Sequence, residues 1–131
     1  MDMIKVETQA LSGDALNWAV MKSEGVELLP IIKDGEFKGW LTADDKMPWL
    51  GKISDFVNDW NLVKRLVIKY VLSLSRAQDG RWMASPERID EPTTWSYAAD
   101  PGAAFCKAVV TLVLGDIIEV PVTLIDQLGK A

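Results

Sequence analysis

The chain contains no histidine and only one cysteine, and these two shortages exclude much of enzyme chemistry. Histidine is the commonest general base and metal ligand, so triads and metal sites that depend on it are excluded. The single cysteine, Cys106, lies in a strongly apolar segment, whereas a reactive thiolate needs electropositive and partly exposed surroundings. We therefore expect Cys106 to be a small core residue, and we expect no catalytic residue, no cofactor and no metal.

Other motifs are missing as well. Asp55 and Asp59 lie four residues apart, but helix capping explains two carboxylates at a helix start as well as a cation site does. Gly35 and Gly39 are not followed by the lysine and hydroxyl residues of a phosphate-binding loop. No uninterrupted run of 18 apolar residues exists, so we expect no membrane span.

The length of 131 residues predicts a single domain over residues 1–131. The N-terminal residues lack the basic and apolar regions of a signal peptide. A lone cysteine cannot close an internal disulfide, which fits a reducing compartment. We therefore expect a cytoplasmic location.

Charge is unevenly distributed along the chain. The net charge is −5, but residues 52–85 carry +3 while residues 1–51 and 86–131 carry −4 each. A nucleic-acid-binding domain usually has a basic balance overall, so nucleic-acid binding is an alternative rather than the leading hypothesis. Its contacts would be the basic residues of the middle segment: Lys64, Arg65, Lys69, Arg76 and Arg81.

Residues 67–99 are predicted to form the sheet at the centre of the fold. Strands are expected at 69–76, 81–85 and 94–99, with a tight turn at Asp79-Gly80 between the first two. Because side chains alternate across a strand, the two faces should differ. The apolar face is predicted to hold Tyr70, Leu72, Leu74, Trp82, Ala84, Trp95 and Tyr97. The small, mostly polar face is predicted to hold Val71, Ser73, Ser75, Met83, Ser85, Thr94 and Ser96.

Three helices are predicted to pack on this sheet. The first covers residues 13–24 with Ser12 as its cap, and the third runs from Asp100-Pro101 to Leu114. The second begins within residues 54–59, and its end cannot be separated from the strand that follows. Its predicted apolar stripe contains Trp60, Val63 and Val67.

Shorter extended segments are expected at both ends, at residues 4–6 and 117–122, and a second hairpin should turn at Asp34-Gly35. The predicted fold class is α+β. A small antiparallel sheet of three or more strands is packed by three main helices in a sandwich-like arrangement.

Four segments of the chain resemble a known family: residues 11–20 (LSGDALNWAV), 56–61 (FVNDWN), 80–85 (GRWMAS) and 98–108 (AADPGAAFCKA). In this order they are similar to segments of the NinX-like family of small lambdoid-phage proteins and of the related phage ABA-sandwich domain. The resemblance implies a phage or prophage protein with helices packed on a small antiparallel sheet. It implies no established activity.

The leading functional hypothesis is a non-enzymatic accessory protein that binds a host or phage protein or a second copy of itself. Either the small sheet face lies under the loop of residues 40–53, or it meets another chain. An acidic DNA mimic is a further alternative, based on the negative ends of the chain. The predicted partner surface consists of Ser73, Ser75, Met83, Thr94 and Ser96.

Overall fold

The computed structural model describes residues 3–25, 28–42, 55–86, 95–122 and 124, with the backbone alone in 28–32 and 36–42. These residues form three α-helices, α1 (Gly13–Ser23), α2 (Trp60–Tyr70) and α3 (Pro101–Leu114). A 3₁₀ turn (Thr8–Ala10) precedes α1. None of the described helices is long and apolar enough to cross a membrane.

The described strands form three antiparallel sheets, which confirms the α+β class but divides the strands more than predicted. β1 (Met3–Glu7) pairs with β7 (Ile117–Pro121), so the first and last described strands lie side by side. β2 (Leu28–Lys33) and β3 (Glu36–Thr42) form a separate hairpin. The three-stranded sheet consists of β4 (Leu72–Arg76), β5 (Trp82–Pro86) and β6 (Ser96–Ala98).

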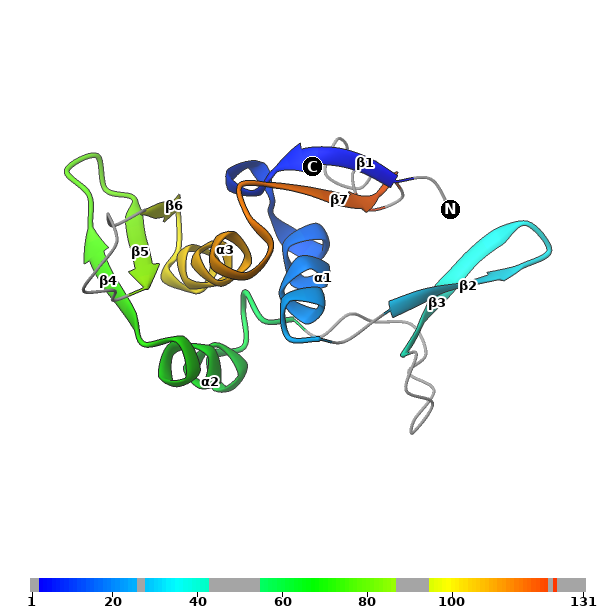
Figure 1. The fold of residues 1–131 in the computed structure, drawn as a ribbon, viewed down its shortest axis with the longest axis horizontal. Coiled ribbons are helices and arrows are strands. Elements are labelled where there is room, and N and C mark those ends of the chain that lie inside the picture. The colour runs from blue at the N-terminus through cyan, green and yellow to red at the C-terminus, as the bar shows by residue number, and fades with distance from the viewer. Residues whose placement is uncertain (1–2, 26–27, 43–54, 87–94, 123, 125–131) are drawn as a thin grey trace.

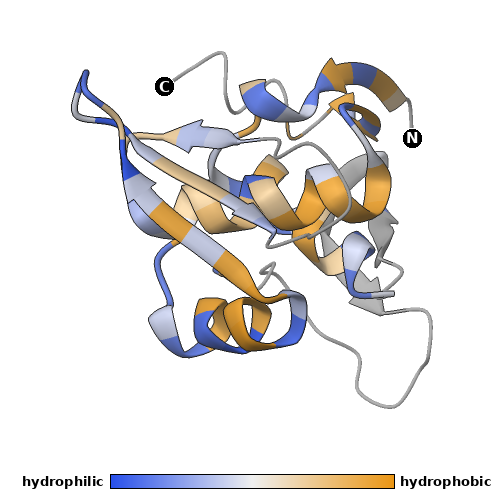
Figure 2. Ribbon diagram, turned by 60° about the vertical axis from the view of Figure 1, so that its left-hand side comes forward, coloured by the Kyte–Doolittle hydropathy of each residue, from blue (hydrophilic) through white to orange (hydrophobic). Residues whose placement is uncertain are grey.

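Helix α3 lies at the centre, between the three-stranded sheet and α1 (Figure 1). Its start is confirmed, since the Asp100 carboxylate accepts a hydrogen bond from the Ala103 amide at 2.9 Å and Pro101 occupies the first turn. It ends at Leu114, as predicted, and Gly115 follows with φ of 102°. Coloured by hydropathy, α3 is hydrophobic along nearly its whole length, as a helix packed on several sides must be (Figure 2).

Both predicted hairpin turns are present. Asp34 and Gly35 have φ values of 55° and 77°, and Gly80 has φ of 92°. Tight hairpin turns need such positive φ values, which glycine and aspartate tolerate better than most residues. The Asp-Gly pairs therefore predict both turns correctly from local sequence.

The boundary between α2 and β4 is resolved in favour of the helix. Asp59 caps α2 by accepting a hydrogen bond from the Asn61 amide at 3.0 Å, and the helix continues to Tyr70. Lys69 and Tyr70 are therefore helical, and the prediction that the strand begins at residue 69 is wrong. At the start of α1, Ser12 occupies the cap position but makes no side-chain capping hydrogen bond.

The phase of β6 also differs from the prediction. Ala84 lies opposite Ser96, and Met83 lies opposite Tyr97. The inner face of the sheet, which joins the same core as α3, holds Leu72, Leu74, Trp82, Ala84, Ser96 and Ala98. The outer face holds Ser73, Ser75, Met83, Ser85 and Tyr97. Tyr97 and Ser96 thus exchange their predicted faces, because a one-residue shift in phase moves every side chain of a strand across the sheet.

Candidate interaction surfaces

The predicted partner surface is only partly assembled by the sheet. Ser75 and Met83 lie opposite each other on the outer face, and Ser73 lies on the same face. Ser96 does not belong with them, because it points to the inner face and is only 1% exposed. Thr94 lies outside the described residues. The outer face also contains Ser85, which is buried, so this face is not solvent-exposed over its whole length.

A polar network explains why Ser96 is buried. Gln9 Nε2 donates to Ser96 Oγ at 3.0 Å and to Thr111 Oγ1 at 3.3 Å. The Oε1 atom of the same side chain accepts from the Tyr97 amide at 3.3 Å. Gln9 therefore connects the 3₁₀ turn to β6 and α3, and the serine hydroxyl has a partner at the inner face.

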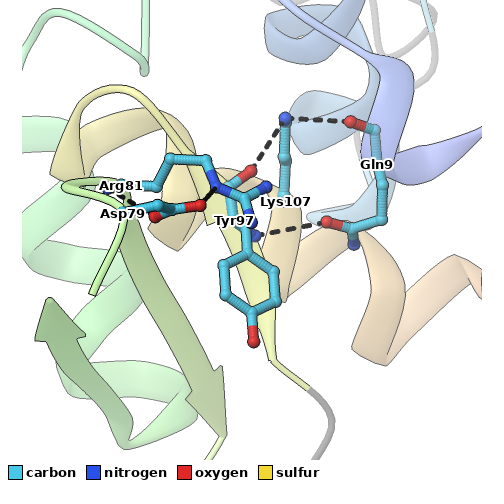
Figure 3. Close-up of polar contacts among 5 residues, drawn as sticks. All are labelled: Gln9, Asp79, Arg81, Tyr97 and Lys107. Atoms are coloured by element: carbon cyan, nitrogen blue, oxygen red, sulfur yellow. Dashed lines mark hydrogen bonds and ion pairs between the residues drawn. The ribbon is translucent and has the colours of Figure 1, made fainter. Parts of the chain in front are cut away.

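Lys107 strengthens this connection (Figure 3). Its Nζ donates to the carbonyl oxygens of Gln9 at 2.9 Å and Tyr97 at 3.0 Å. Burial lowers the pKa of this lysine, Asp100 opposes that shift, and Arg81 reinforces it. The ammonium group thus ties three segments together, and we assign it a structural role rather than a catalytic one.

Two arginines stack on aromatic rings near the turn of the β4–β5 hairpin. The Arg81 guanidinium lies 4.6 Å from the centre of the Tyr97 ring, and Arg76 lies 5.0 Å from the centre of the Trp82 ring. Arg81 Nε also contacts Asp79 Oδ2 at 2.7 Å (Figure 3). Hydrogen bonds from the backbone and side chain of Arg81 lower the pKa of that carboxyl. The charge of Arg81 is therefore compensated within the turn.

The five basic residues predicted for nucleic-acid contacts do not form one patch. Lys64, Arg65 and Lys69 lie on α2, whereas Arg76 is the last residue of β4 and Arg81 directly precedes β5. The two arginines therefore lie at the end of the β4–β5 hairpin that points away from α2 (Figure 1). Lys69 Nζ pairs with Glu24 Oε2 at 2.8 Å. Among the residues that the structure describes, Lys64 and Arg65 have no carboxylate partner. The described part of the chain thus leaves these two positive charges of α2 without a partner.

Sequence reasoning missed the apolar residues beside those two charges. Trp60 is 56% exposed and Ile68 is 70% exposed, although Trp60 was predicted to face the core. The core side of α2 is formed by Val63 and Leu66, each 1% exposed. Trp60 lies at its flank, with its ring centre 6.1 Å from that of Phe105. The sequence held one sign of this exposed surface: Ile68 is a large apolar residue that lies outside the predicted apolar stripe, next to polar positions of the helix.

Val71 ends α2 in a conformation that is unusual for valine. Its φ and ψ are 52° and 68°, in the left-handed region, and its side chain is 55% exposed. A β-branched residue there is strained by roughly 1–2 kcal/mol, and glycine is the usual occupant of such helix ends. Together with the α2 residues above, it completes an exposed set that we call the α2 surface: Trp60, Lys64, Arg65, Ile68 and Val71.

Cys106 and Asp55, the residues considered for thiol chemistry and for metal binding, are buried or hydrogen-bonded within the fold. Cys106 is fully buried, and burial raises the pKa of its thiol to about 12, with contributions from Asp100 and Asp55. Asp55 accepts hydrogen bonds from Asn58 and Asn17, and the Asn58 side chain is the main cause of its lowered pKa. Within the described ranges, no group of three histidine, cysteine, aspartate or glutamate residues could hold a metal ion.

The α2 surface thus combines large exposed apolar side chains with two basic residues that have no carboxylate partner among the described residues. Tryptophan and arginine are the residue types most enriched among those that dominate binding energy at interfaces. No protein-family model and no curated protein matches this chain.

Proposed function

We propose that this protein acts by binding another protein through the α2 surface, without catalysing a reaction. The observation that carries the proposal is the exposure of Trp60, Ile68 and Val71 along one helix and its end. Single apolar residues on a surface are ordinary, but several large ones grouped together are typical of an interaction site.

The conformation of Val71 supports the same surface. Left-handed backbone at a β-branched residue costs stability, and such strain is often retained where a side chain contributes to function. Glycine would relieve the strain at this helix end, but it would also remove an exposed apolar side chain from the α2 surface. Contact with a partner would explain why a strained, exposed valine occupies this helix end in place of glycine.

Like charges argue against a symmetric contact between two copies of α2. Lys64 and Arg65 would face the same residues of the second copy, and this juxtaposition is unfavourable. We therefore propose a different protein as the partner. The resemblance of four segments to phage proteins suggests a host or phage protein in the bacterial cytoplasm, and that context is part of the proposal.

The proposal can be tested by affinity capture from bacterial lysate with the full chain. Trp60→Ser and Ile68→Ser together should abolish capture of the protein that the unaltered chain binds. Ile117→Ser is the control, because Ile117 is 61% exposed but lies on β7. Circular dichroism should show that all variants are folded. Undiminished capture by the α2 double variant would contradict the proposal.

A further inference from the structure

We infer that the partner presents an amphipathic helix that carries acidic side chains beside its apolar ones. The inference rests on the proposed function and adds the chemistry of the segment that is bound. It follows from two features of α2. The first is the spacing of its exposed residues, and the second is the positive charge of Lys64 and Arg65, which no described carboxylate pairs with.

The spacing favours a helix as the bound element. Trp60, Lys64 and Ile68 are four residues apart and therefore form one ridge along α2. Val63 and Leu66 occupy the core side of the helix, and the ridge runs from the flank of that side at Trp60 to the solvent side at Ile68. Ridges of this spacing pack into the groove between equivalent ridges of a second helix, which is the commonest helix packing in globular proteins. The α2 surface thus has the shape of one half of a helix pair.

The charge favours acidic residues on that second helix. Glu24 compensates Lys69, and Asp79 compensates Arg81, but no described carboxylate pairs with Lys64 or Arg65. Both side chains are exposed beside Trp60 and Ile68. Aspartate or glutamate at the rim of a docked helix would complement them and set its register. Apolar residues at its centre would cover Trp60 and Ile68.

Nucleic acid is a weaker match to the same surface. A phosphate backbone is bound by many cations along a continuous track, whereas Arg76 and Arg81 lie at the other end of the β4–β5 hairpin from α2. The chain as a whole also has a net charge of −5, which opposes a polyanion at longer range. To bind an acidic helix, the protein needs only the two local positive charges of Lys64 and Arg65.

A displayed library of helical peptides, randomised on one face, tests the inference with the full chain. Peptides selected by the unaltered protein should combine aspartate or glutamate with leucine, isoleucine or tryptophan at helical spacing. The double variant Lys64→Glu, Arg65→Glu should bind those peptides about tenfold more weakly, because two ion pairs become repulsive. It should also select peptides with lysine or arginine in their place.

The control is the double variant Lys5→Glu, Lys33→Glu, which has the same net charge but alters exposed lysines elsewhere. Its peptide affinity should be unchanged when circular dichroism shows that it is folded. Selection of no peptide, of peptides without acidic residues, or of peptides that bind the α2 variant equally well would overturn the inference.

Two further probes separate other occupants. A duplex or single-stranded oligonucleotide, or vesicles of phosphatidylcholine with phosphatidylserine, should show no binding that depends on Lys64 and Arg65. Such binding would overturn the inference in favour of a polyanion or a membrane. If lysate capture depends on Trp60 and Ile68 but not on the two charges, the proposed function stands and the acidic helix is rejected.

Discussion

Gly102 in α3 packs directly against the backbone of Val57. A Cβ atom at Gly102 would lie only 2.2 Å from the Val57 carbonyl oxygen. On its other side, the Val57 amide donates to Oδ1 of the buried Asn17 in α1 at 3.0 Å. The segment that leads into α2 is therefore held between α1 and α3, and the position of the α2 surface depends on this contact.

Substitution of Gly102 provides a prediction with an unusual sign. Gly→Ala inside a helix normally stabilises a protein by about 0.5–1 kcal/mol. Gly102→Ala should instead destabilise this one by roughly 1–3 kcal/mol, because the methyl group would overlap the Val57 carbonyl. Urea unfolding measures the difference, with Val113→Ala on the exposed side of α3 as the control. A stabilised Gly102→Ala variant would show that the two backbones do not pack this closely.

Ser96 and Ser75 form a matched pair that tests the two faces of the sheet. Ser96→Arg should cost about 3–5 kcal/mol, because it buries an unpaired charge against the core. Ser75→Arg places the same side chain on the exposed end of the outer face and should change stability by about 0.5 kcal/mol or less. Thermal or urea unfolding of the two variants decides the matter. Equal losses would mean that the phase of β6 is not the one described.

Cys106 should make stability fall at alkaline pH. Its pKa rises from 9.0 to about 12 on folding, so the native state favours the neutral thiol. The contribution is complete below the unfolded value of 9.0 and is lost as pH rises toward 12. The slope from this group is at most about 1.4 kcal/mol per pH unit. Cys106→Ala should flatten this part of the curve of unfolding free energy against pH.

The same burial predicts slow chemistry at the thiol. A maleimide or disulfide reagent should label native Cys106 slowly and label it fast only after unfolding. Rapid labelling of the folded protein at neutral pH would contradict the packing of α3.

Val71 offers a substitution that should separate stability from binding. Val71→Gly should stabilise the protein by about 1 kcal/mol, since glycine adopts the left-handed backbone without strain. The same change removes an exposed apolar group from the α2 surface, so partner capture should weaken. Val71→Ala removes the apolar group but keeps most of the strain, and it is the control for binding. A destabilised Val71→Gly variant would show that the strain is absent.

By itself, the sequence determined those features whose signals are local. Asp100-Pro101 and Gly115 mark both ends of α3, and the two Asp-Gly pairs mark the hairpin turns, because capping and positive φ depend on a few adjacent residues. The α+β class follows from these elements and from the alternating segments between them. The missing histidine and the apolar setting of Cys106 were likewise readable without the fold.

Only the tertiary structure decided which side of each element is covered. The alternation in β6 suits either face, and pairing with β5 selects the one that turns Ser96 inward and Tyr97 outward. In the same way, hydrophobicity assigned Trp60 to the core, but Val63 and Leu66 are the residues of α2 that the core buries, and Trp60 meets Phe105 only from the flank. That choice left Trp60 and Ile68 exposed beside Lys64, because a helix packed on one side can bury only one stripe.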